Sequence, residues 1–189
     1  MQRFTREELD SFRDSEVPDL YGDDLRLLFV GINPGLWTAA VQTHFAHPAN
    51  RFYPALLAAG IITRPINPST GMTPEDRAHF TGRGLGLTNL VRRATARADE
   101  LSPAELREGG AALREFVNEH RPAVVAVAGI TAYRTAFKVP AAKAGRQPGT
   151  FAGSILWVVP NPSGLNAHET AASLARAYAE PAREAGIID

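Results

Sequence analysis

The chain has 189 residues, a formal net charge of zero, 44% hydrophobic residues and no cysteine. This length and composition fit one compact domain with a single core, and they exclude disulfides and thiolate metal sites. No apolar run approaches the roughly 18 residues that span a bilayer, and the N-terminal residues lack the apolar stretch of a signal peptide. We therefore expect a cytoplasmic protein with no membrane association.

Charge is unevenly distributed along the chain. Residues 1–24 hold eight acids against three arginines, so the rest of the chain has a positive balance. We accordingly expect an acidic, partly helical leader at 1–24 and one domain at 25–189. Five arginines and no acid lie between Arg77 and Arg97. That stretch either faces phosphates or forms a solvated loop, and charge alone favours neither.

In the first half of the chain, apolar runs and turn residues predict two strands and two helices. Leu25–Val30 is a continuous apolar run of strand length, typical of a strand buried on both faces. Residues 61–83 are rich in Pro, Gly and Thr, which predicts a segment that is mostly loop. The expected elements are an amphipathic helix at 3–14, a strand at 25–30, a helix at 49–59 with Pro54 in its first turn, and a weak strand at 84–90.

The clearest helix begins after Ser102, its predicted N-cap. Pro103 fits the first helical position and Glu105 fits the capping box, and the helix runs to about His120. The elements expected after it are a strand at 123–128, a helix at 131–138, a loop at 141–153, a strand at 155–159 and a helix at 168–184. Because strands alternate with helices, the sequence predicts an α/β fold, a three-layer α/β/α sandwich around a central, mainly parallel sheet of four to five strands.

Two asparagine–proline turns follow predicted buried strands. The first consists of Gly31, Ile32, Asn33, Pro34 and Gly35. The second consists of Asn161, Pro162, Ser163, Gly164 and Leu165. Open α/β sheets bind ligands at the carboxyl ends of their strands. The two turns therefore predict a cleft with an Asn on one lip and a Leu on the other.

The first turn has a defined chemistry. Pro34 biases Asn33 toward an extended conformation, which holds its side chain on a stiff turn. An Asn amide offers an acceptor oxygen and two donor hydrogens but no basicity near neutral pH. Asn33 can hold a water molecule and cannot take a full proton, which predicts a slow hydrolase that depends on a good leaving group. The motif alone fits a purely structural turn equally well.

The segment after the first turn contains aromatic and imidazole side chains. Phe45 has a flat face suited to stacking on a base, although core packing is the simpler explanation for a lone Phe. Histidine is a common metal ligand, but no residues neighbouring His44 and His47 complete a ligand shell. We expect no metal and no cofactor.

Five blocks together resemble a known family. They are GINPGL at 31–36, FAHPANRFY at 45–53, GLTNLVRR at 86–93, ELREGG at 105–110 and PNPSGLN at 160–166. In order and spacing they resemble the mismatch-specific uracil-DNA glycosylases, bacterial relatives of thymine-DNA glycosylase in the uracil-DNA glycosylase superfamily. The similarity runs from about Leu25 to Tyr178.

The resemblance implies a base-flipping repair enzyme that acts on duplex DNA as a monomer. It would extrude uracil or a related pyrimidine, notably opposite guanine, and hydrolyse its N-glycosidic bond. By analogy Asn33 holds the attacking water, Ile32 lines the pocket, Phe45 stacks on the flipped base and Asn89 contacts the base edge. Thr38 is a weaker candidate for the pocket.

The resemblance also gives the second turn a role. Gly164 and Leu165 would enter the duplex as a wedge, and Asn166 would bond the orphaned partner base, often guanine. Without the family match, Leu165 is better read as a buried anchor of its loop. Relatives commonly have an Arg after the wedge, whereas Ala167 and His168 stand here, which puts the contacts to the partner base in doubt.

Asp99 precedes the capped helix and follows the GLTNLVRR block. It either reaches the sugar, as a base or as a stabiliser of positive charge, or it is a helix-leading acid near a positive N-terminus. We favour the second reading. Two other functions stay open at this level: a damaged-DNA binding module with little or no catalysis, and a small-molecule nucleotide hydrolase, for which the sequence lacks a carboxylate cluster.

Overall fold

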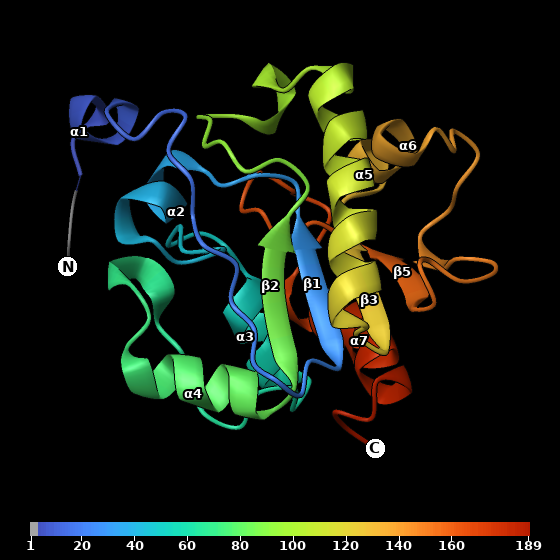
Figure 1. The fold of residues 1–189 in the computed structure, drawn as a ribbon. Coiled ribbons are helices and arrows are strands. Elements are labelled where there is room, and N and C mark those ends of the chain that lie inside the picture. The colour runs from blue at the N-terminus through green and yellow to red at the C-terminus, as the bar shows by residue number, and fades with distance from the viewer. Residues whose placement is uncertain (1–3) are drawn as a thin grey trace.

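A computed structural model describes residues 4–189 as five strands flanked by helices on both sides (Figure 1). The strand order is β2-β1-β3-β5-β4, and every pair is parallel except β4 with β5. The strands are β1 (Leu27–Gly31), β2 (Leu85–Asn89), β3 (Val124–Ala128), β4 (Gly145–Arg146) and β5 (Ile155–Val159). The predicted fold class is confirmed.

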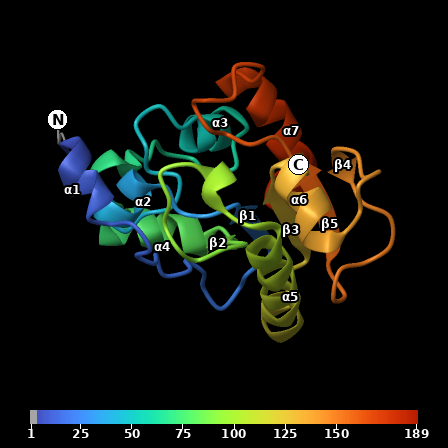
Figure 2. The ribbon, with the colours of Figure 1, turned by 90° about the horizontal axis from the view of Figure 1, so that it is seen from above.

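Side chains alternate between the two faces of the sheet, and each face carries its own apolar cluster. Leu27 and Phe29 of β1 belong to one cluster, while Leu28 and Val30 belong to the other. Helices α3 (Phe52–Ala58) and α7 (Ala171–Glu184) contribute to the first cluster, and α5 (Pro103–His120) and α6 (Ile130–Phe137) to the second. Figure 2 shows the two pairs on opposite sides of the sheet. Burial on both faces explains why the strands read as continuous apolar runs.

Helix α5 begins as its sequence predicts and packs very closely. Ser102 accepts from the backbone N–H of Glu105, and Glu105 accepts from that of Ser102. One turn further on, a Cβ added at Gly109 would lie 2.1 Å from the carbonyl oxygen of Leu90. Only glycine lets α5 approach the segment that follows β2 this closely.

Several predicted elements were wrong in extent or type. Residues 61–83 are not all loop, because α4 (Pro74–Gly82) forms there behind a capping box made by Thr73 and Asp76. Helix α2 (Leu36–Val41) was not predicted, since six residues are too few for a helical period to show. Helix α1 (Arg6–Asp10) is shorter than the predicted 3–14 helix, of which Arg3 lies outside the described residues.

The leader packs on the body of the domain. Leu20 exchanges two backbone hydrogen bonds with Leu87, so the leader lies along the outer edge of β2. Val17 is buried against α2 and Ala94. Backbone bonds also join Asp14 and Ser15 to Ala94. The acidic segment therefore covers an edge strand that would otherwise leave backbone groups unpaired.

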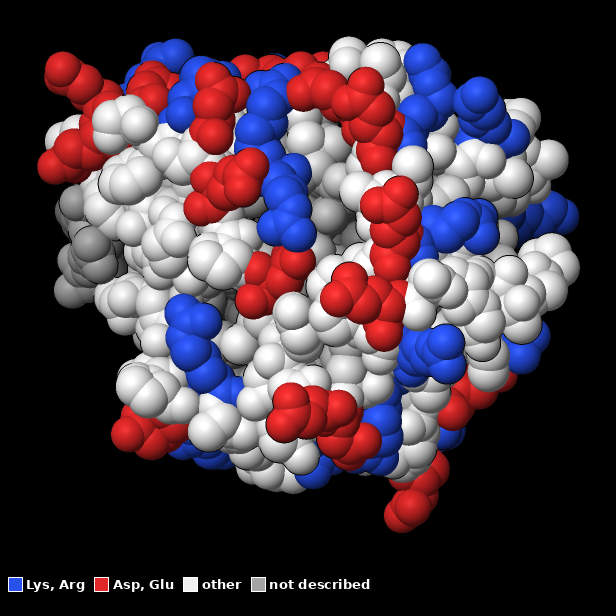
Figure 3. Space-filling view, in the orientation of Figure 1, with Lys and Arg blue, Asp and Glu red and all other residues white. Residues whose placement is uncertain are grey.

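Leader acids also partner the arginines that follow β2. Arg92 lies 2.7 Å from Asp19, and Arg93 contacts both Asp14 at 3.0 Å and Glu105 at 2.5 Å. Acidic and basic side chains are accordingly interspersed on this face (Figure 3). Both arginines are thus committed within the protein, which favours the structural reading of the arginine-rich stretch over an open phosphate-binding face.

Among residues 4–189, no helix is long and apolar enough to cross a membrane.

The close packing at Gly109 predicts a steric penalty. Replacing Gly109 by Ala forces a methyl group onto the Leu90 carbonyl, so we expect the free energy of unfolding to fall by about 1–3 kcal/mol. Urea denaturation measures it. Gly82, also helical but with nothing within 4 Å of an added Cβ, is the matched control. Gly82→Ala should be neutral or stabilising by up to about 1 kcal/mol, and equal responses of the two variants would contradict the proposed contact.

Candidate functional site

The two asparagine–proline turns lie at the same edge of the sheet. They follow β1 and β5, which pair in parallel with the two sides of β3. Two strand spacings of about 4.8 Å separate β1 from β5, so the turns begin about 10 Å apart. At the end of β3, a Cβ on Gly129 would come within 3.3 Å of Ile32 and 3.9 Å of the amide nitrogen of Asn161. Gly129 thus keeps the space between the turns open.

Asn33 is held by two hydrogen bonds that fix its orientation. Its Nδ2 donates to the carbonyl oxygen of Arg93 at 3.0 Å and to Oγ1 of Thr95 at 2.8 Å. Because the carbonyl of Arg93 can only accept, the Asn33 amide cannot be flipped so that Oδ1 takes the place of Nδ2. Both hydrogens are therefore used inside the protein, and Oδ1 is left as the acceptor.

The segment after β2 is joined to the first turn on both sides of Asn33. Leu90 and Val91 donate to the carbonyls of Gly31 and Ile32, both at 2.9 Å, and Thr95 donates to the carbonyl of Pro34 at 3.1 Å. The strand pairing of β1 with β2 ends at Gly31, backbone bonds continue to Ile32, and the two segments pair again where Gly35 bridges Thr95. Asn33 lies in the gap between these two points. The sequence did not identify Thr95, which stands in an Arg- and Ala-rich stretch without a recognisable motif.

Gly31 is the point where Phe45 and Asn89 meet. A Cβ at Gly31 would lie 2.4 Å from Oδ1 of Asn89 and 3.3 Å from Cζ of Phe45. Phe45 has a left-handed backbone, with φ of 55°, and its ring stacks on Phe52 with centroids 4.2 Å apart. Any side chain at position 31 would fill the space between the half-buried aromatic ring and the amide.

A buried histidine sets the orientation of Asn89. Nε2 of His44 lies 2.9 Å from the carbonyl oxygen of Pro18, so Nε2 carries the hydrogen. Nδ1 of the neutral ring then accepts from Nδ2 of Asn89 at 3.1 Å. Asn89 retains Oδ1 and one Nδ2 hydrogen for a ligand. Since Pro18 belongs to the leader, that segment takes part in arranging the site.

The second turn is braced by its own side chains and has an exposed tip. Oδ1 of Asn161 accepts from the N–H of Ser163, and Oγ of Ser163 accepts from the N–H of Leu165. Tyr178 of α7 donates to the carbonyl of Pro160 at 2.9 Å. Leu165 is 88% exposed, so the alternative reading as a buried anchor is wrong.

Asn166 is already engaged within this loop. Its Nδ2 donates to the carbonyl oxygen of Asn161 at 3.2 Å, and its Oδ1 accepts from the N–H of His168 at 3.3 Å. The amide therefore holds the loop together in this structure. A contact with a partner base would have to use its second Nδ2 hydrogen or the second lone pair of Oδ1.

Two of the predicted site residues, Thr38 and Asp99, use their side chains in contacts with other parts of the protein. Thr38 of α2 is buried, and its Oγ1 accepts from the N–H of Ala46, which fixes the backbone beside Phe45. Asp99 lies in the short 3₁₀ helix η2 (Ala98–Glu100), where its exposed carboxylate pairs with Arg97. Thr38 acts through the Phe45 loop, and Asp99 has the surface contact expected of an acid that leads into α5.

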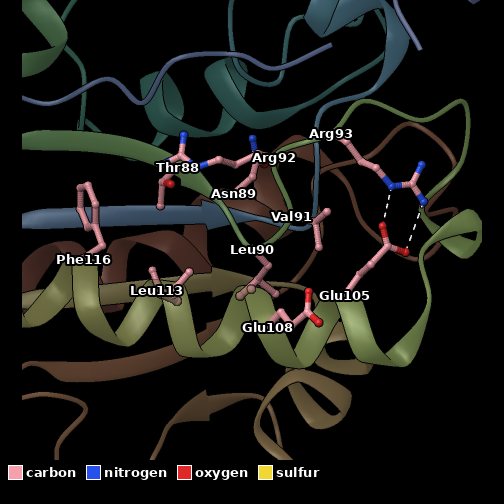
Figure 4. Close-up of a pocket in the computed structure, with 12 residues that line it drawn as sticks. Thr88, Asn89, Leu90, Val91, Arg92, Arg93, Glu105, Glu108, Leu113 and Phe116 are labelled. Carbon is pink, nitrogen blue, oxygen red and sulfur yellow. Dashed lines mark hydrogen bonds and ion pairs between the residues drawn. The ribbon is translucent and has the colours of Figure 1, made fainter. Parts of the chain in front are cut away.

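A hollow of about 370 Å³ lies between α5 and the segment that follows β2 (Figure 4). The Arg93–Glu105 pair stands at one end and Phe116 at the other. Pairing with Arg93 lowers the pKa of Glu105 to about 2. Asn89 lines this hollow, whereas Phe45 and Gly31 do not. Phe45 and the first turn therefore lie outside this hollow. Within residues 4–189, no group of three or more His, Asp or Glu is placed to hold a metal ion.

The fold is that of an open α/β protein, a class that binds ligands at the carboxyl ends of its strands, where both turns of this chain lie. Residues 18–182 match the family model described as the uracil DNA glycosylase superfamily. The chain therefore belongs to that superfamily. The solution NMR structure of a protein from Methanosarcina acetivorans, proposed to be a uracil DNA glycosylase, superposes with a TM-score of 0.60. The match has 15% identity and covers 91% of this chain and 96% of the other, a level at which the likeness concerns the fold alone.

Burial of His44 predicts a specific pH dependence. Burial lowers the pKa of His44 below its ordinary 6.5. The charges of Arg77 and Arg92 also lower this pKa, whereas the hydrogen bond to the Pro18 carbonyl and the charge of Asp19 raise it. The unfolded chain takes up this proton at higher pH than the folded protein, so stability is lost as pH falls below 6.5. His44→Gln keeps one donor and one acceptor but does not titrate. Between about pH 8 and pH 5.5, wild type should lose about 1 kcal/mol of unfolding free energy relative to this variant.

Urea denaturation at the two pH values gives both free energies of unfolding. A difference in unfolding free energy between the two proteins that is the same at both pH values would show that His44 is not held as a neutral ring in the folded protein.

Proposed function

We propose that this chain is a monofunctional DNA glycosylase of the mismatch-specific branch, acting as a monomer on uracil or a related pyrimidine opposite guanine. Membership of the superfamily supports a glycosylase type of function with DNA as the partner. The observation that carries the finer proposal is the fixed amide of Asn33, whose two donor bonds leave Oδ1 as an acceptor at the strand edge. That geometry suits a residue that orients water.

Asn33 would orient the nucleophile without activating it fully. A water that donates to Oδ1 turns a lone pair toward C1′ of the flipped nucleotide. The C1′–N1 bond breaks with its electron pair leaving on the base, the water oxygen bonds to C1′, and the proton of the water is lost to solvent because an amide does not accept it. Such a reaction relies on stabilising the departing uracil anion, and preorganised donors are the usual means.

Asn89 and Phe45 would recognise the flipped base. The imide edge of uracil has one N–H donor between two carbonyl acceptors, and Asn89 offers Oδ1 together with one Nδ2 hydrogen. Phe45 supplies a ring already supported by Phe52 on one side. A flat apolar surface beside an amide fits a pyrimidine, and aromatic stacking is commonly worth about 1–3 kcal/mol per base.

Leu165 would act as the wedge that occupies the gap left by the flipped nucleotide. Apolar side chains inserted between base steps offset part of an unstacking cost of a few kcal/mol. Leu165 is 88% exposed, so its side chain is free to enter a duplex. Its position at the tip of a braced turn supports the wedge role.

The experiment is a release assay with labelled oligonucleotides that contain G·U, A·U, G·T or single-stranded uracil. We expect wild type to release free uracil from G·U without cutting the strand. Asn33→Ala should slow single-turnover release at least about a hundredfold while retaining DNA binding, because a mispositioned nucleophile costs about that much. Asp99→Ala should remain near wild type, since Asp99 is exposed and paired with Arg97.

Three outcomes would change this assignment. Tight binding to G·U or abasic duplexes with no base release over hours would favour the damaged-DNA binding module. Loss of most turnover in Asp99→Ala, with DNA binding intact, would make the carboxylate a participant in the reaction. Release of free uracil at the wild-type rate by Asn33→Ala would contradict the proposed mechanism.

A further inference from the structure

Arg51 joins the segment that carries Phe45 to the second turn. Its backbone N–H donates to the carbonyl oxygen of Pro162 at 3.0 Å. Its guanidinium donates to the carbonyl oxygens of Asn166 at 3.0 Å and Ser163 at 3.5 Å. One arginine thus binds three carbonyls of the turn that carries Leu165. Both side-chain bonds come from one guanidinium nitrogen, Nη1, and bonds from a charged donor to carbonyls are stronger than neutral ones.

The contact between these two segments is also tight beside Arg51. A Cβ on Gly164 would lie 2.7 Å from the carbonyl oxygen of Ala49 and 2.8 Å from its Cβ. Gly164 therefore packs directly on the segment that leads into Arg51. Next along the chain, Phe52 stacks on Phe45. The proposed base-stacking ring and the proposed wedge are supported by adjacent residues of one segment.

Arg51 has no competing role in the described part of the chain. None of the ion pairs within 4.0 Å among residues 4–189 includes it, unlike Arg92 and Arg93. Its side chain is half-buried under the second turn. The nitrogen Nη1 of this guanidinium is directed at backbone carbonyls of the second turn, and a salt-dependence measurement tells this role from a phosphate contact.

We propose that Arg51 is the positioning residue of the wedge: it holds the 162–166 turn so that Leu165 stays exposed at its tip, and it ties that tip to the Phe45 stack. The inference rests on the proposed glycosylase function. It assigns Arg51 to duplex opening rather than to bond cleavage. Loss of Arg51 should therefore slow base release most from the substrates whose target base costs most to flip out of the duplex.

The test compares two duplexes of identical length and flanking sequence, one with uracil opposite guanine and one with uracil opposite a tetrahydrofuran abasic analogue. Both present the same phosphates, but the second lacks the base pair that must be broken. We expect Arg51→Met to slow single-turnover release from G·U by about tenfold to a hundredfold, the range for losing bonds to a charged donor. On the unpaired uracil the loss should stay within about threefold, and Arg51→Lys should recover part of the G·U rate.

Three further variants make the result specific. Leu165→Ala removes the wedge itself, and Gly164→Ala displaces its turn without touching Arg51; both should show the same selective loss on G·U. Arg183→Met removes a guanidinium that pairs with Glu180 at the end of α7 and should match wild type on both duplexes. Gly164→Ala also serves if Arg51→Met does not fold.

Equal losses on both duplexes, or no loss on either, would overturn the positioning role. A salt dependence of binding that weakens by about one charge in Arg51→Met, with Gly164→Ala unchanged, would identify a phosphate contact instead. If wild type releases uracil from neither duplex, the proposed function itself fails, which the wild-type arm reports separately from any effect of Arg51.

Discussion

The site depends on one constraint, the two hydrogen bonds that Asn33 donates through Nδ2. The carbonyl of Arg93 and the hydroxyl of Thr95 leave the amide a single orientation and commit its Oδ1 to accept. Each bond is worth only about 1 kcal/mol, but together they decide which atom faces the strand edge. For a group without basicity, orientation is its main contribution to hydrolysis. In the proposed mechanism, the segment from Leu90 to Thr95 therefore takes part in positioning the nucleophile.

The same principle recurs around the site. Carbonyls that can only accept determine what their partners do: Pro18 fixes the tautomer of His44, and His44 in turn orients Asn89. The partners come from distant parts of the chain, so the leader, the first turn and the β2 segment function as one unit. Close packing at Gly31 and Gly109 keeps these segments near one another. The parallel sheet brings them together because β1, β2, β3 and β5 all end at one edge.

The sequence predicted what local patterns control. The four main strands and helix α5 are readable because apolar runs and a capping box act over a few residues. Helix α4 was missed although Thr73, Pro74 and Asp76 form a comparable start signal, because the surrounding Pro and Gly residues outweighed it. Thr95 could not be predicted at all. Its role arises from the register that sets Gly35 beside it, and register between segments about 60 residues apart is a tertiary property.

The most direct test of the account removes one of the two acceptors that orient Asn33, the hydroxyl of Thr95, without changing the volume of the side chain at position 95. Thr95 is buried, so Thr95→Val keeps the volume but loses the hydroxyl, whereas Thr95→Ser keeps the hydroxyl. Single-turnover release of uracil from a G·U duplex should fall about tenfold or more in Thr95→Val, equivalent to about 1.4 kcal/mol, with DNA affinity unchanged and with Thr95→Ser close to wild type. Equal rates for the Val and Ser variants would contradict the claim that this hydrogen bond orients the amide.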